Sequence, residues 1–215
     1  ILIVPVYTRF LSPDSYGGLD MLTVFASLIN LTVALEISQG LARSYADTGT
    51  DHERSLYAST ALWFSTAAYS LFAIISLVFS GPLSDFLLDG TKWEPVFRIA
   101  VMATALNGIF LFLQNQLRWI LKPKAYAVCR VAYAFISTGI GILLVTAYDS
   151  GVAGIFYGQI IGALAGGLLA WFPARHLFKA VFSMEKCKEM LIFSTPLVPS
   201  SISVLVAVYV DRIAI

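Results

Sequence analysis

Long apolar segments dominate this chain and constrain its fold more than any other feature. Six windows have the length of about 20 residues that a helix needs to cross the hydrocarbon core of a membrane, and a shorter apolar stretch precedes them. We therefore expect an all-α fold, a polytopic transmembrane helical bundle. The expected membrane helices cover 1–10 (the end of a first helix), 18–42, 55–80, 96–118, 126–147, 151–174 and 191–215.

The composition excludes a soluble domain. Hydrophobic residues make up 58% of the chain and charged residues 13%, whereas soluble domains carry roughly 25% charged residues. The mean hydropathy is +0.80. The net charge is only +1 and there is no block of basic residues, so nucleic acid is not an expected partner.

Motifs for catalysis, cofactors and metals are missing from the sequence. Cys129 and Cys187 fit neither a paired metal motif nor a disulfide framework. His52 and His176 stand alone, without the spacing of a metal-binding HExxH motif, and no GxSxG is present. We therefore predict no catalytic residue, no cofactor and no metal, and we do not expect an enzyme.

Both ends of the chain read as interrupted apolar segments. It begins "ILIVPVYTRF", without an initiator Met or a signal-peptide pattern, and it stops in "VAVYVDRIAI". We expect a piece of a larger transporter, truncated at both ends. The expected parts are an N-terminal transmembrane lobe (1–174), a cytoplasmic amphipathic linker (175–190), read either as an interfacial helix or as an exposed loop, and the incomplete first helix of a second lobe (191–215).

The distribution of basic residues predicts the orientation of the bundle. Ten of the fourteen lysines and arginines fall in loops on one side, and basic loops face the cytoplasm. The short loops 11–17, 81–95 and 148–151 should then lie outside. The ten basic residues are Arg43, Arg54, Arg118, Lys122, Lys124, Arg130, Arg175, Lys179, Lys186 and Lys188.

A glycine at every fourth position marks the segment "GIFYGQIIGALAGG". Glycines at this spacing share one stripe of a helix and let a second backbone approach closely. The stripe predicts a tight helix–helix seam, which either packs statically or slides during transport. Its members are Gly154, Gly158, Gly162 and Gly166.

A few charged and amide side chains interrupt the apolar segments. Charges inside a membrane are costly and usually face a protein interior or a cavity. Glu36 is read either as a structural carboxyl or as a gating or proton-coupling group, and Arg98 either as a functional cation or as a side chain reaching the headgroups. Asp211 and Arg212 are neighbours on a helix, so they should project in different directions.

Three stretches of the sequence resemble the polysaccharide flippases, which include the O-antigen repeat-unit exporters. They are "PVYTRFLSPDSYG", "GLARSYAD" and "STPLVPSSISVLVAVYVDR", and the turn "LRWILKPKAYAV" is similar as well. This family belongs to the multidrug/oligosaccharidyl-lipid/polysaccharide exporter superfamily. The resemblance implies two lobes of helices around a central cavity, of which this chain supplies the first, in a bacterial inner (plasma) membrane.

The resemblance also implies a substrate, a polyprenyl-diphosphate-linked oligosaccharide that is flipped to the outer leaflet for surface polysaccharide such as lipopolysaccharide. Arginine suits the diphosphate because its planar fork donates several hydrogen bonds. Membrane lipids and other polysaccharide assembly proteins are further expected partners. The candidate residues are Arg212 and Arg98 for the diphosphate, and Gln114, Asn115 and Gln159 for the sugar.

Two alternatives remain open at this point. A cation-coupled exporter of small molecules from the same superfamily would use Glu36 or Asp211 as its ion site. A membrane-embedded glycan polymerase or ligase would need a large outer loop, and the longest one here, 81–95, is small. The arginine motifs of peptidoglycan-precursor flippases and the acid–aromatic pattern of multidrug exporters are not evident, which favours polysaccharide repeat units.

Overall fold

The protein is a bundle of membrane-spanning helices, as the sequence predicts. The computed structural model describes residues 9–88 and 90–213, and for residues 91 and 208–213 it describes the backbone alone. Within these residues six segments are long and apolar enough to cross a membrane, and no strand occurs. The helices are α2 (Pro13–Thr32), α3 (Ile37–Asp47), α4 (Asp51–Val78), α5 (Ser80–Leu88), α6 (Glu94–Trp119), α7 (Pro123–Ala147), α8 (Gly151–Ala174), α9 (Met184–Ser194) and α10 (Val198–Ile213).

Helices α6, α7 and α8 lie close to their predicted positions. Proline begins or nearly begins several helices, with Pro13, Pro95 and Pro123 at the first or second helical position. Proline is favoured there because the missing N–H would have no partner inside the helix. The Ser12 hydroxyl accepts a hydrogen bond from the N–H of Ser15 (3.2 Å) and caps α2.

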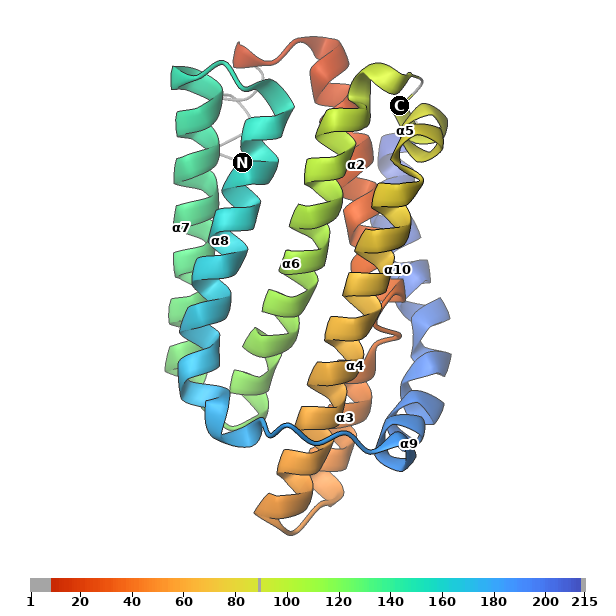
Figure 1. The fold of residues 1–215 in the computed structure, drawn as a ribbon, viewed down its shortest axis with the longest axis vertical. Helices are drawn as coiled ribbons and strands as arrows, with labels where there is room; N and C mark the ends of the chain where they lie inside the picture. Colours follow the sequence, from red (N-terminus) through yellow and green to blue (C-terminus); the bar gives the residue numbers. More distant parts are fainter. Residues whose placement is uncertain (1–8, 89, 214–215) are drawn as a thin grey trace.

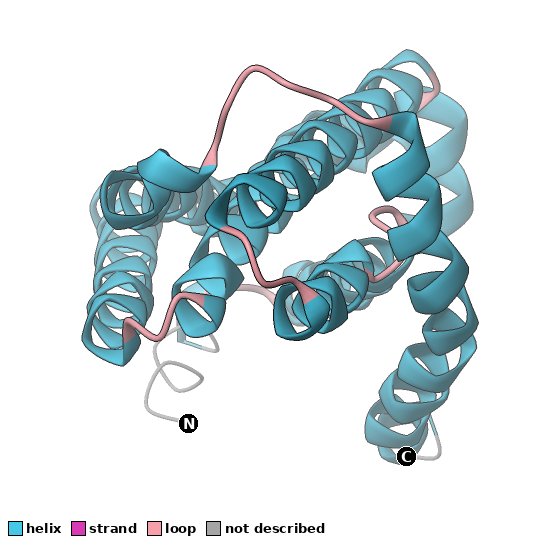
Figure 2. Cartoon of the chain, turned by 90° about the horizontal axis from the view of Figure 1, so that it is seen from below, coloured by secondary structure: helices cyan, strands magenta, loops and turns pink. Residues whose placement is uncertain are grey.

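The helices form two neighbouring groups. On one side α6, α7 and α8 stand together, and α7 and α8 share the most extensive interface of the bundle (Figure 1). On the other side lie α2, α3 and α4, with α9 and α10 at the edge (Figures 1 and 2). The turns that carry most of the basic residues, between α3 and α4, α6 and α7, and α8 and α9, lie at one end, the lower end in Figure 1.

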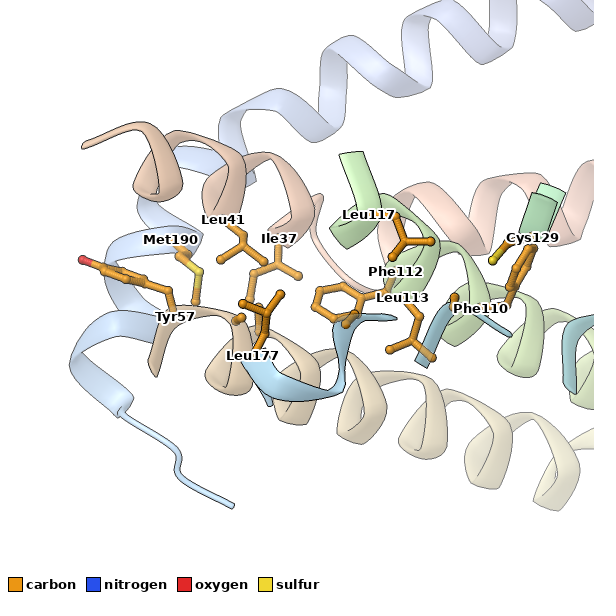
Figure 3. Packing of buried hydrophobic residues seen from close by; sticks show 14 of the residues in the cluster. Ile37, Leu41, Tyr57, Phe110, Phe112, Leu113, Leu117, Cys129, Leu177 and Met190 are labelled. Carbon is orange, nitrogen blue, oxygen red and sulfur yellow. The ribbon is translucent and has the colours of Figure 1, made fainter. Parts of the chain in front are cut away.

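The apolar core is divided along the helix axes into two clusters. One fills the basic end, where Leu41 of α3, Leu117 of α6 and Met190 of α9 are buried together (Figure 3). The other fills the opposite end around Phe97 and Phe156. This division positions the site described below, because the boundary between the clusters falls near the middle of the bundle.

The predicted outer loop 81–95 is largely helical, so its description as a loop is wrong. Helix α5 and the short 3-10 helix η1 (Thr91–Trp93) occupy most of it. The Ser80 hydroxyl at the start of α5 donates to Glu94 Oε1 of α6 (2.8 Å). This hydrogen bond fastens the segment to the next membrane helix.

The segment 175–190 is not one interfacial helix, and its middle agrees with the other interpretation, an exposed loop: residues 179–182 are exposed and belong to no helix. A 3-10 helix η2 (Arg175–Leu177) is followed by an extended strand-like linker to Ser183, where α9 begins. The linker crosses the lower end of the bundle from α8 to α9 (Figure 1). Hydroxyl groups of α4 hold it there: Ser55 donates to the Leu177 carbonyl (2.7 Å), and Ser59 and Thr60 accept from the N–H groups of Lys179 (2.8 Å) and Ser183 (3.1 Å).

The predicted last helix, 191–215, starts differently in the structure. Helix α9 runs on to Ser194, a 3-10 turn η3 (Thr195–Leu197) follows, and α10 starts at Val198. Pro196 and Pro199 explain the interruption, since each removes a backbone donor and crowds the preceding turn. The proposed division into lobes at 174 and 190 stays a prediction.

Replacing Ser59 by alanine will loosen the linker. Its side chain is fully buried, and the change leaves the N–H of Lys179 without its acceptor, which costs about 1–3 kcal/mol. We expect a lower thermal midpoint of the purified protein and faster amide exchange in residues 178–183. A Ser38→Ala variant serves as control, and equal exchange in both variants would contradict the account.

Candidate functional site

One membrane span is broken near its middle, between α2 and α3. The predicted helix 18–42 is therefore wrong as a single helix. Residues 33–36 form turns, and Leu35 and Glu36 adopt left-handed backbone conformations (φ 47° and 52°). Side chains other than glycine are strained there, by about 1–3 kcal/mol each. Inside a membrane such irregular backbone is tolerated only where protein or a water-filled cavity surrounds it.

Polar side chains from the neighbouring helices gather at this break. The Tyr69 hydroxyl of α4 donates to the carbonyl and side-chain oxygens of Asn30, in the last turn of α2 (3.4 and 3.3 Å). Glu36 lies at the C-terminal end of the break, immediately before α3. The Tyr69 ring in turn packs directly on Gly108 of α6, where a Cβ would collide with it. Three helices therefore meet at the break.

Two further polar groups at the same depth have no partner. Ser65 lies one turn from Tyr69 on the same face of α4, and Asn107 precedes Gly108 on α6. The hydroxyl of Ser65 and the side-chain oxygen of Asn107 are buried without a hydrogen bond within the described residues. Buried polar atoms normally have partners, so each such exception calls for a ligand, water or movement. We call Asn30, Glu36, Ser65, Tyr69 and Asn107 the midplane cluster.

The midplane cluster separates the two apolar clusters of the core. Ala34, within the break, and Ile109 pack against both of them. Ser65 and Asn107 each stand near the midpoint of a helix that spans the bundle. The cluster therefore lies near the middle of the membrane, with apolar layers above and below it.

The chemistry of the midplane cluster suits a polar or cationic group. Glu36 is half buried, and none of the ion pairs among the described residues includes it. A carboxylate, two amides, a hydroxyl and a phenol supply donors and acceptors for hydroxyl groups or for a cation. The turn at 33–36 can also act as a hinge, because it lacks a continuous helical hydrogen-bond ladder.

Arg98 lies away from the midplane cluster, near the start of α6, at the end of the bundle opposite the basic turns. Its Nη2 donates to Glu94 Oε1 (2.7 Å) and its Nε donates to Ser80 Oγ (2.9 Å). The side chain remains 56% exposed. The contacts hold α5 against α6, and a role in diphosphate binding stays a prediction.

The three predicted sugar-binding amides lie in different surroundings. Gln114 is buried, and its amide donates to the Tyr126 carbonyl of α7 (3.4 Å). Asn115 and Gln159 are half buried, and Gln116, next to Asn115, is fully buried. Gln114 lies about two turns beyond Asn107 on the same face of α6, whereas Asn115 is rotated by about 80° from that face. Of the three, Gln114 therefore lies nearest to the face of the midplane cluster.

The glycine stripe of α8 lies at close helix contacts. A Cβ on Gly158 would meet the backbone of Ser137 and Gly141 in α7, and one on Gly162 would lie 2.7 Å from Ser137 Cβ. Gly154 also faces α7, whereas Gly166 faces the Phe110 ring of α6. Whether this seam also slides stays a prediction.

Asp211 and Arg212 fall among the residues whose side chains the structure does not describe. Their direction, and any role in coupling or substrate binding, therefore stays a prediction. Asn30, Ser65 and Tyr69 were not among the site residues predicted from the sequence. An asparagine five residues before Leu35 was the available signal, but nothing in "NLTVALEIS" marks a turn, since the segment holds neither glycine nor proline.

The architecture is that of a multi-pass helical membrane protein with one discontinuous span at a polar site, which fits a membrane transporter. Residues 6–215 match the family described as polysaccharide biosynthesis protein, and the chain belongs to that family. Comparisons with curated proteins and with solved structures gave no match.

Proposed function

We propose that the protein is a transporter that flips polyprenyl-diphosphate-linked oligosaccharide repeat units from the cytoplasmic to the outer leaflet of a bacterial inner membrane, by alternating access. The broken span with the midplane cluster carries the proposal. A sugar chain and a diphosphate must cross a hydrocarbon core about 30 Å thick. Polar groups halfway across shorten the apolar distance that this polar head must cross without a hydrogen-bond partner. Membership of a polysaccharide biosynthesis family supports the class of substrate.

The basic end of the bundle is proposed to face the cytoplasm. The turns between α3 and α4, α6 and α7, and α8 and α9 carry most of the lysines and arginines, in keeping with the bias of cytoplasmic loops. The start of α2, helix α5 and the turn 148–151 then face outside. Substrate would enter at the basic end, and other polysaccharide assembly proteins would act on it at the other.

In the proposed mechanism the protein forms no covalent bond with the substrate. The lipid tail stays in the bilayer while the head passes the midplane cluster, whose groups exchange hydrogen bonds with sugar hydroxyls. Movement about residues 33–36 would close one side and open the other. Arg212, in α10, is proposed to hold the diphosphate, with Arg98 as a second candidate near the exit.

The test is a strain that lacks the protein and is complemented with the full-length form. An impermeant oxidant reaches only sugars on the exposed leaflet, which is the outer leaflet in intact spheroplasts and the cytoplasmic leaflet in inside-out vesicles. Comparing oxidation in the two preparations shows which leaflet holds the repeat units. The proposal predicts that they accumulate on the cytoplasmic leaflet in the deletion strain and with Arg212→Ala. Unpolymerised units on the outer leaflet would instead indicate a polymerase or ligase, and intact glycans with drug sensitivity a small-molecule exporter.

A further inference from the structure

A cavity of about 630 Å³ opens at the basic end of the bundle, far from the midplane cluster. The end of α3, the start of α4, the end of α6 and η2 form its walls. Its polar and aromatic side chains are those of Tyr45, Asp51, Arg54, Ser55, Trp119 and His176, and the rest of the wall is apolar, including Leu121 at the turn between α6 and α7. Whether the cavity suits an anion therefore depends on how far Asp51 neutralises Arg54.

The guanidinium group of Arg54 uses only part of its capacity to donate hydrogen bonds. Its Nε donates to the Thr48 carbonyl (3.2 Å), which fixes the side chain, and its Nη1 lies 3.6 Å from Asp51. Asp51 is fully exposed, so this ion pair is weak. Within the described residues Nη2 makes no hydrogen bond, and the guanidinium keeps a free edge for a phosphate.

Two aromatic donors beside Arg54 lack acceptors. The hydroxyl of Tyr45 and the indole N–H of Trp119 are buried without hydrogen bonds within the described residues. An indole N–H can only donate, so its missing partner must be an acceptor. Trp119 also lies under the guanidinium of Arg118 (5.5 Å). Both residues line the cavity, but their donor atoms are closed off from it in this conformation, so a rotation of each side chain is needed to bring the donor to a ligand beside Arg54.

A neighbouring cavity of about 540 Å³ differs from the first cavity in its charged groups. There the Tyr57 hydroxyl donates to Glu189 (2.7 Å), and Lys186 pairs with the same carboxylate (3.3 Å). Arg43 lies 3.8 Å from Asp47. This second cavity holds two carboxylates, Asp47 and Glu189, and one cation, Arg43, so it is less suited to an anion than the first cavity.

The first cavity also has an apolar rim. Leu121 is 85% exposed. It also lines a separate, third hollow together with Arg118, Pro123 and Tyr126. Helix ends with tyrosine and tryptophan typically lie at the level of the lipid headgroups. A ligand with an anionic head and an apolar chain can place the head beside Arg54 and the chain along Leu121.

We propose that this cavity binds the phosphate group of a membrane amphiphile, with Arg54, Tyr45 and Trp119 as donors and Leu121 beside the apolar chain. The phosphate belongs either to an anionic phospholipid or to a polyprenyl diphosphate. The polyprenyl diphosphate alternative rests on the proposed function and the phospholipid alternative does not. Because binding is measured without transport, failure of the site and failure of the proposed function can be told apart.

The test measures binding to the purified full-length protein by thermophoresis. The probes are dioctanoyl phosphatidylglycerol, dioctanoyl phosphatidylcholine, farnesyl diphosphate and inorganic diphosphate.

Arg54→Gln should weaken binding of the anionic amphiphile about tenfold, the loss expected for a charge-assisted hydrogen bond. Arg43→Gln, at the neighbouring cavity, should bind as the wild type does. Leu121→Asn should also weaken binding, and it should fold normally, because asparagine tolerates the left-handed backbone at this exposed position (φ 55°).

Each outcome of this experiment either supports or overturns the proposed binding site. Binding of phosphatidylglycerol over phosphatidylcholine that is lost in Arg54→Gln supports the site and assigns the phosphate to a phospholipid. The same loss with farnesyl diphosphate alone supports it and assigns the phosphate to the substrate class. Equal binding by wild type, Arg54→Gln and Leu121→Asn overturns the proposal, as does inorganic diphosphate binding as tightly as farnesyl diphosphate.

Discussion

Replacing Gly158 by alanine will destabilise the protein by about 3 kcal/mol, the upper part of the usual range for overpacking. The new methyl group would meet the backbone of Ser137 and Gly141 in α7. Backbone atoms cannot rotate away as a side-chain end can, so α7 and α8 must separate. For a chain of this size the thermal midpoint should fall by roughly 6–12 °C.

Gly167→Ala is the matched control for this change. It lies in the same helix, and a Cβ there would meet nothing within 4 Å. Its thermal midpoint should equal that of the wild type or exceed it slightly, since alanine favours the helix. Equal losses in the two variants would show that α8 is sensitive to any added methyl group and would contradict a close seam along the glycine stripe.

Replacing Glu36 by glutamine will reduce export of the repeat units tenfold or more, with little change in stability. Glutamine keeps the size of the side chain and one acceptor oxygen, replaces the other oxygen by an amide donor, and removes the charge. Because no ion pair within the described residues depends on that charge, folding should tolerate the change. A charge-assisted interaction with a moving group is worth about 1.5–3 kcal/mol, which corresponds to the tenfold loss.

Glu185→Gln provides the matched comparison, since Glu185 is exposed in the first turn of α9. Surface polysaccharide per cell, at equal protein level, is the measurement. Wild-type amounts with Glu36→Gln would assign this carboxylate a purely structural role, one of the two interpretations that the sequence leaves open.

The spans themselves follow from the sequence because membrane helices depend on a local property. A window of apolar residues must satisfy its own backbone hydrogen bonds in lipid, and prolines such as Pro95 and Pro123 fix where α6 and α7 begin. The spacing of the α8 glycines likewise predicts a close contact without naming the partner, which the structure identifies as α7 and, for Gly166, α6.

The features that the sequence does not predict depend on contacts between distant segments. The linker after Leu177 has helical spacing of apolar residues, yet Ser59 and Thr60, more than a hundred residues earlier, bind it in an extended form. The break at Leu35 and Glu36 has no local breaker residue. Tertiary contacts, such as the packing of Met190 against Gly40, must offset the strain there.

The most direct test of the central claim is reconstitution of the full-length protein in liposomes that carry a fluorescent polyprenyl-diphosphate-linked oligosaccharide. An impermeant quencher added outside reports the rate at which the label crosses. The account predicts rapid crossing with the wild type and with Glu185→Gln, and a rate at least about tenfold lower with Glu36→Gln. Two results would contradict it. One is that the label crosses no faster in liposomes with the wild-type protein than in protein-free liposomes, and the other is that it crosses as fast with Glu36→Gln as with the wild type.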